Sequence, residues 1–186
     1  MSTGTIILIA ILAVVAYAIS IYNRLVRHKN LVDEGWSGIE TQLKRRANLI
    51  PNLIETVKGY AKHEEETLEN VVRLRNQATS ASDVGERGAA EGQLTAALGR
   101  LFALAEAYPD LKANENFMRL QGALSELEDQ IQLARRYYNC TVRDMNILVE
   151  AFPSNIVAGR FGFVRAKFFE IEEAADRAVP QVDFNT

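Results

Sequence analysis

The sequence predicts an all-α protein in which an N-terminal transmembrane helix continues into an antiparallel bundle of four long helices, with a short helical C-terminal segment. Three observations predict this architecture. Residues 6–22 are almost wholly aliphatic, and no Asp, Glu, Lys, Arg or His precedes Arg24. Beyond that point, apolar residues recur at steps of three and four, which is the spacing of one helix face. The 4 prolines stand where this helical pattern bends or ends.

The first element is a membrane anchor. At about 1.5 Å per residue, residues 4–23 just reach the length of roughly 20 residues that crosses the hydrocarbon core. Two other interpretations compete with a retained anchor. One is a signal peptide cleaved near Ala16-Tyr17-Ala18, and the other is a helix lying in the membrane interface. No cation precedes the apolar run, which argues against a signal peptide.

The segment after the apolar run is basic. Arg24, Arg27 and Lys29 follow it directly, and we expect them at the membrane interface. Cations beside a span favour the cytoplasm, so the N-terminus is predicted outside and the remaining chain inside. The expected domains are 1–23 for the anchor, 24–30 for the juxtamembrane segment and 31–186 for the bundle.

A long amphipathic helix should follow the basic segment and form one rod with the anchor. Its apolar positions are Val32, Trp36, Ile39, Leu43, Ile50, Leu53, Val57 and Tyr60. Arg46 interrupts this seam, which predicts a buried ion pair with an acidic residue such as Glu126 or Glu128. Pro51 predicts either a kink with one lost backbone hydrogen bond or a true break.

Two shorter helices are expected next. Three glutamates after His63 place negative charge on the first turn of a helix that should run to about Ser80. Residues 80–88 are rich in turn formers and predict a loop. A third helix then stops at Pro109, and its apolar face comprises Leu94, Leu98, Leu101, Ala105 and Tyr108.

The fourth long helix has the clearest pattern, a coiled-coil heptad repeat. One heptad position holds Phe117, Leu124, Ile131, Tyr138, Met145 and Phe152, and the position three later holds Leu120, Leu127, Ala134, Thr141 and Leu148. Short connections between these helices favour alternating directions, as in an antiparallel bundle.

The C-terminal segment 156–171 is aromatic and basic. Its aromatic residues are Phe161, Phe163, Phe168 and Phe169. Three interpretations remain open for them: closure of the chain's own bundle, contact with a neighbouring subunit, and contact with lipid headgroups.

The residues resemble the LemA family of bacterial membrane-anchored helical proteins over nearly the whole chain. The matching motifs are Val32-Asp33-Glu34-Gly35-Trp36, Gln42-Leu43-Lys44-Arg45-Arg46, Leu49-Ile50-Pro51-Asn52-Leu53, Lys58-Gly59-Tyr60-Ala61, Tyr108-Pro109-Asp110-Leu111-Lys112-Ala113-Asn114, Tyr138-Asn139 and Phe152-Pro153. Gly35 and Met145-Asn146 depart from the family pattern. The resemblance implies one N-terminal span in the bacterial inner membrane, a cytoplasmic helical bundle, and no catalytic residues to carry over.

Composition excludes several classes of function. The 21 Lys and Arg against 24 Asp and Glu give no basic field for nucleic acid. His28 and His63 are far apart and Cys140 is alone, so no metal site is predicted. No phosphate loop or other cofactor motif is present either, because residues 85–88 lack the Lys and Ser/Thr that a nucleotide needs.

The leading hypothesis is therefore a nonenzymatic membrane scaffold, in contact with membrane lipid, that self-associates into a homo-oligomer. The alternative is an adaptor that docks a membrane protease or another envelope protein, because the resemblance implies an association with membrane proteolysis. An enzymatic function would need a site built from carboxylates and arginines that no motif indicates.

Overall fold

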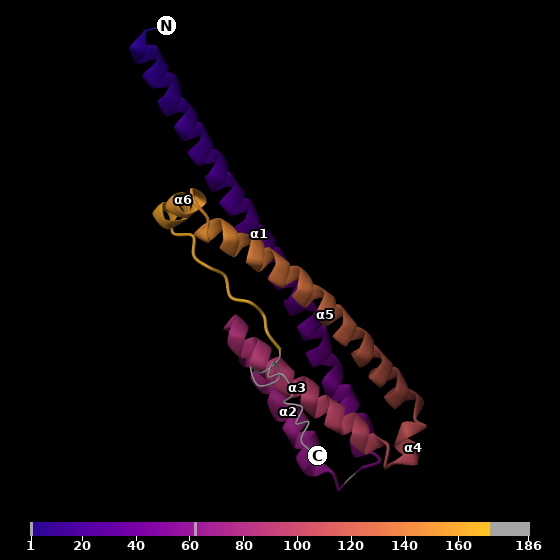
Figure 1. Ribbon diagram of the computed structural model, residues 1–186. Helices are drawn as coiled ribbons and strands as arrows, with labels where there is room; N and C mark the ends of the chain where they lie inside the picture. Colours follow the sequence, from indigo (N-terminus) through magenta and orange to yellow (C-terminus); the bar gives the residue numbers. More distant parts are fainter. Residues whose placement is uncertain (1, 62, 172–186) are drawn as a thin grey trace, which may run out of the picture. The chain divides into compact units, whose positions relative to one another are not determined.

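The computed structural model describes residues 2–61 and 63–171. Within these residues the chain forms α-helices and no strand, which confirms the all-α class (Figure 1). The helices are α1 (Thr3–Lys58), α2 (Glu65–Ser80), α3 (Val84–Ala105), α4 (Pro109–Lys112), α5 (Glu115–Glu150) and α6 (Ser154–Phe161). Residues 163–171 follow α6 without regular secondary structure.

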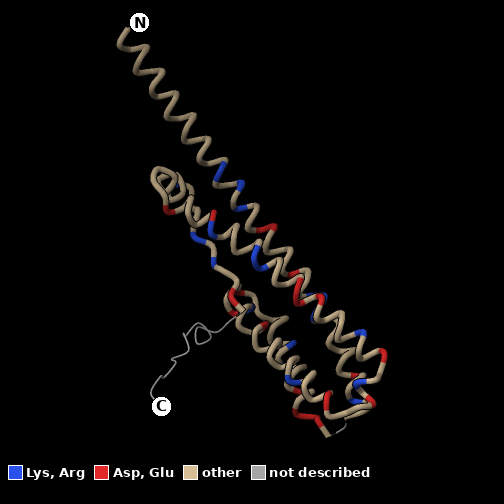
Figure 2. The backbone as a smooth tube through the Cα atoms, turned by 45° about the vertical axis from the view of Figure 1, so that its right-hand side comes forward, with Lys and Arg blue, Asp and Glu red and all other residues tan. Residues whose placement is uncertain are grey.

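The predicted rod is confirmed, because α1 continues without a break through the apolar run, the basic segment and the amphipathic seam. Its first turns carry no charge, and the first cations appear only after the apolar stretch (Figure 2). Among the described residues, α1 alone is long and apolar enough to cross a membrane, with a mean hydropathy of 2.6 over its best window. The large side chains of this stretch are exposed, as an anchor requires.

The helix continues through Pro51, and the structure shows what replaces the lost backbone hydrogen bond. Proline has no N–H, so the carbonyl of Ala47, four residues earlier, has no helical partner. Arg75 of α2 donates from Nε to this carbonyl oxygen at 3.2 Å. A side chain from the neighbouring helix therefore satisfies the group that the proline leaves free.

The chain forms two compact units, and α1 and α5 contribute to both. Of the described residues, unit 1 contains 2–39 and 133–167, and unit 2 contains 40–61, 63–132 and 168–171. The core of unit 2 draws on α1, α2, α3, α4 and α5. Its buried residues are Ile50, Leu53, Ile54, Val57, Ala61, Leu68, Val71, Leu74, Ala78, Ala90, Leu94, Ala97, Leu98, Leu101, Ala105, Leu111, Phe117 and Leu124.

The predicted loop over residues 80–88 is wrong for most of its length. The connection between α2 and α3 covers only residues 81–83, and the Asp83 side chain caps α3 by accepting from the backbone N–H of Gly85 at 2.9 Å. Gly88 and Gly92 lie within α3, where a Cβ on either would overlap a backbone carbonyl of residues 170–171. These glycines serve close packing of the C-terminal segment rather than a flexible turn.

The two apolar seams are largely buried, as predicted. On α5 the first heptad position is buried from Phe117 to Met145, whereas Leu120 and Ala134 of the second are half-buried. Phe152 is 80% exposed because α5 ends at Glu150, two residues before it. Tyr60 is also exposed, and it lies beyond the end of α1. The exposed members of both seams are therefore those that lie past the end of their helix.

Candidate functional site

A charged network lies in the interior of unit 2, around Arg46 of α1. The Arg46 side chain is 2% exposed. Its Nη1 donates to Glu128 Oε2 at 2.7 Å and to Thr95 Oγ1 at 2.9 Å, while its Nη2 pairs with the carboxylate of Glu91. Arg87 adds a second cation, with Nε 3.3 Å from Glu91 Oε1. Two cations and two carboxylates thus balance one another, with Arg46 and Glu91 buried and the Glu128 side chain 30% exposed.

The structure brings Arg46 to Glu128 and not to Glu126, which is exposed. It also supplies Glu91 of α3, a partner that the sequence reasoning missed. Glu91 carries no motif, and only its spacing from Leu94, Leu98 and Leu101 places it near the buried face of that helix. The network links α1, α3 and α5 of unit 2, and removing one of its members would leave a buried partner uncompensated.

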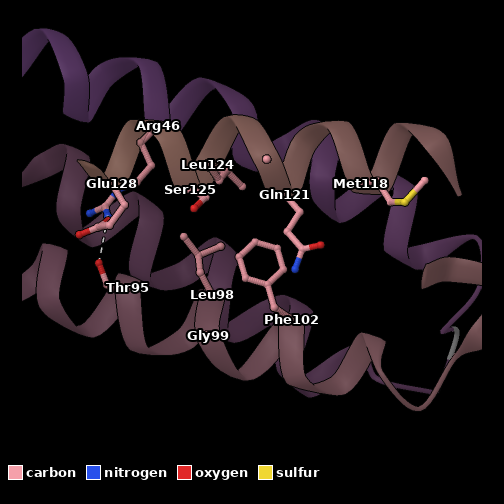
Figure 3. A pocket seen from close by; sticks show the side chains of 11 residues that line it. Arg46, Thr95, Leu98, Gly99, Phe102, Met118, Gln121, Leu124, Ser125 and Glu128 are labelled. Carbon is pink, nitrogen blue, oxygen red and sulfur yellow. Dashed lines mark hydrogen bonds and ion pairs between the residues drawn. The ribbon is translucent and has the colours of Figure 1, made fainter. Parts of the chain in front are cut away.

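An apolar groove of about 650 Å³ adjoins this network in unit 2 (Figure 3). It is lined by Arg46, Thr95, Leu98, Gly99, Phe102, Met118, Gln121, Gly122, Leu124, Ser125 and Glu128. Arg46 and Glu128 stand at one end of the view, and Phe102 and Met118 lie toward the other. A Cβ at Gly99 or Gly122 would meet no atom within 4 Å, so packing does not require glycine on either wall.

The chemistry available in the groove is limited. Its lining includes no His, Cys or Lys, and the charge of Arg46 is already neutralised. Among residues 2–61 and 63–171, no three His, Cys, Asp or Glu side chains gather closely enough to hold a metal ion. The groove therefore suits an apolar side chain or helix better than a reacting substrate.

The residues expected at the membrane interface lie together on α1. Arg24, Arg27 and Lys29 are exposed, within two turns of the end of the apolar stretch. Tyr22 precedes them and contacts two of the four predicted aromatic residues, with ring centroids 4.9 Å from Phe161 and 5.8 Å from Phe163.

The predicted aromatic set therefore divides between the units. Phe161 and Phe163 contact Tyr22 in unit 1, whereas Phe168 and Phe169 belong to unit 2. Phe169 is fully buried, and Phe168 is partly exposed. Of the three interpretations, closure of the chain's own bundle is the one that fits Phe169, because a side chain with no accessible surface meets neither lipid nor a neighbouring subunit.

Side chains of α5 hold the segment after α6 by its backbone. The Asn146 amide both accepts from the N–H of Ala166 at 2.8 Å and donates to its carbonyl at 3.0 Å. Tyr138 donates its hydroxyl to the carbonyl of Lys167 at 2.8 Å. Burial, and secondarily the negative charge of Asp33, raise the pKa of Tyr138 above its ordinary value. The hydroxyl thus remains a donor well into the alkaline range.

A second face of α5 in unit 1 exposes large apolar side chains. Leu133, Tyr137, Cys140 and Ile147 follow one another at helical spacing, and we call them the α5 outer stripe. Leu133 is 52% exposed, Tyr137 47% and Ile147 55%. The sequence reasoning followed the stronger heptad seam and missed this stripe, although its steps of four, three and seven residues repeat the same period.

Comparison with known proteins agrees with this architecture. The sequence profile of the LemA family matches residues 35–184. Magnetosome protein MamQ 2 of Paramagnetospirillum magneticum is 27% identical, over 92% of this chain and 74% of that protein. Protein LemA of Metamycoplasma hominis is 28% identical, over 88% of this chain and 73% of that protein. With its anchor-like α1, its long α5 and a profile match over most of its length, the chain belongs to the LemA family.

Proposed function

We propose that this protein is a nonenzymatic, membrane-anchored scaffold whose copies associate side by side at the bacterial inner membrane. The α5 outer stripe is the observation that carries the proposal. The opposite face of α5 is already buried, so the helix has packed its first seam and still exposes a second one. Exposed apolar surface at heptad-like spacing is typical of a helix that packs against another helix.

Charges of both signs accompany the stripe on α5. Arg136 is exposed beside it, and Arg143 and Asp144 form an exposed ion pair at 3.1 Å between Cys140 and Ile147. A second copy of the chain would therefore meet both signs of charge along the same helix. Opposite charges flanking an apolar contact select the partner and its register more than they add affinity.

The anchor supports the same proposal. Copies held in one membrane by α1 share one orientation, which raises their effective concentration for side-by-side contact. With Arg24, Arg27 and Lys29 on the cytoplasmic side, the helices after the anchor would stand in the cytoplasm. The antiparallel arrangement expected from the short connections remains part of this proposal.

An adaptor that docks another membrane protein is the second candidate. The groove of about 650 Å³ in unit 2 favours it, because its glycines leave space beside Leu98 and Phe102. Copurification separates the two functions. An adaptor holds a different protein at fixed stoichiometry, whereas a scaffold recovers mainly itself.

Cross-linking through Cys140 tests the scaffold. Cys140 is exposed within the stripe and is the only cysteine of the chain. A short bis-maleimide applied to membranes containing the full chain should link copies into dimers. The matched control, Cys140→Ser with Ser82→Cys, moves the thiol to the exposed α2–α3 connection in unit 2 and should link poorly. Equal cross-linking at both positions would show collision rather than contact through the stripe.

A further inference from the structure

We propose that the region around α6 is a lipid-binding surface that lies in the headgroup layer beside the anchor and prefers anionic lipid. Its apolar part, the α6 patch, comprises Phe152, Ile156, Phe161 and Val164. Their exposed fractions are 80%, 63%, 61% and 75%, so the chain leaves most of the surface of these four large apolar side chains in unit 1 uncovered.

Contact with Tyr22 fixes the depth of this surface. Tyr22 lies at the end of the apolar stretch of α1, two residues before the first cation, where tyrosine marks the boundary between hydrocarbon and headgroups. The ring of Phe161 packs against it with centroids 4.9 Å apart. When α1 crosses a bilayer, α6 is therefore held at the level of the interface.

The side of α6 that the protein covers is the side with small residues. Ser154 and Ala158 are buried, whereas Ile156, Arg160 and Phe161 are exposed. Closure of the chain's own bundle would bury the large side chains and leave the small ones outside. The exposed arrangement instead gives α6 an outward apolar surface.

The charges around the patch are those that an anionic surface attracts. Arg160 and Arg165 are exposed, and no Asp or Glu occurs from residue 151 to 167. Arg165 has an exposed ion pair with Glu150 at 2.9 Å, which leaves Arg160 as the stronger candidate for a lipid phosphate. Arg24 and Arg27 are exposed on α1 and contribute further positive charge to unit 1. Apolar side chains interleaved with arginine are typical of interfacial segments.

This inference rests on the anchor of the proposed function but not on self-association. A tryptophan reporter tests it in the full chain. Ile156→Trp is placed in a Trp36→Phe background and reconstituted into phosphatidylethanolamine–phosphatidylglycerol vesicles that contain lipids brominated near the headgroup. The wild type is the first control, because Trp36 lies 14 residues beyond Tyr22, or about 21 Å along α1. Val72→Trp in the same background is the exposed control on α2, outside the α5 outer stripe.

The inference predicts that brominated lipid quenches the emission of the Ile156→Trp reporter severalfold more than that of either control. Replacing phosphatidylglycerol with phosphatidylcholine should reduce this quenching. Arg160→Gln should lower the ratio of lipid-contacting to lipid-free reporter about fivefold, the loss of one cation near an anionic surface. Arg119→Gln, at an exposed position of α5 in unit 2, should leave it unchanged.

Two outcomes would overturn the inference, and they have different meanings. If alkaline carbonate extracted the full chain from membranes, α1 would not be a membrane anchor. That result would contradict both this inference and the proposed function. A chain that resists extraction while its Ile156→Trp reporter is quenched no more than the controls contradicts the lipid surface alone. Blue-shifted but unquenched emission would assign the patch to a protein contact instead.

Discussion

The two units of the chain differ in how much of their apolar and charged side chains they bury. Unit 2 buries its apolar seams in one core and encloses a balanced network around Arg46. Unit 1 buries one seam of α5 but leaves the outer stripe and the α6 patch exposed, besides the apolar stretch of α1. The difference places the proposed surfaces for membrane and neighbours in unit 1, and the largest buried core in unit 2.

Breaking the network in unit 2 should have the largest effect on stability. Arg46→Ala leaves the buried Glu91 carboxylate short of its main partner, at a cost of about 3–5 kcal/mol. Urea unfolding of the full chain in detergent, followed by circular dichroism, measures this cost. Lys44→Ala is the control, because Lys44 is exposed on the same helix and should change the free energy of unfolding by less than about 0.5 kcal/mol.

Adding a side chain at the close contact between Gly92 of α3 and Ile171 should lower the stability by a smaller amount. The added Cβ of Gly92→Ala overlaps the carbonyl of Ile171 and should displace the C-terminal segment, costing about 1–3 kcal/mol. Trypsin should then cleave faster after Lys167. Gly99→Ala, on the same helix with open space around it, should instead stabilise the protein by about 0.5–1 kcal/mol. Unchanged cleavage in Gly92→Ala would contradict the close approach.

The hydrogen bond that compensates for Pro51 predicts a coupled pair of substitutions. Arg75→Ala leaves the Ala47 carbonyl without a partner and should cost about 1–2 kcal/mol. Pro51→Ala restores the helical N–H, so Arg75→Ala should cost much less in that background. A double-mutant cycle by urea unfolding measures the coupling. Purely additive free energies would show that Arg75 acts elsewhere.

Periodicity explains which parts of this structure the sequence predicts. The anchor and the two long seams each repeat over many residues, and α1 and α5 follow them to within a few residues of their ends. Residues 80–88 were predicted as a loop because composition does not distinguish a turn from close packing. The spacing of Gly85, Gly88 and Gly92, three and four residues apart, is the helical signal that the loop interpretation overlooked.

The interactions that the sequence did not predict join distant segments, although the pairing of Arg46 with Glu128, 82 positions away, was predicted from the interrupted seam. Glu91 joins Arg46 from 45 positions away, and Asn146 holds the backbone of Ala166 from 20 positions away. A backbone group can accept or donate such a hydrogen bond whatever its own side chain is. The sequence of the held segment therefore shows no pattern that predicts the contact. The aromatic residues of 156–171 looked alike in sequence, yet their neighbours place them in two different units.

Disrupting the α5 outer stripe should have the smallest effect on stability and the largest on assembly. Leu133→Glu with Ile147→Glu changes two exposed positions, so the free energy of unfolding should move by less than about 1 kcal/mol. Gln130→Glu, an exposed position on the same helix just before the stripe begins, is the matched control.

Native mass spectrometry of the full chain in detergent tests the central claim most directly. We predict oligomers for the wild type and for Gln130→Glu, and monomers of unchanged helicity for the Leu133→Glu, Ile147→Glu variant. Folded monomers for the wild type, or intact oligomers in the stripe variant, would contradict a scaffold assembled through α5.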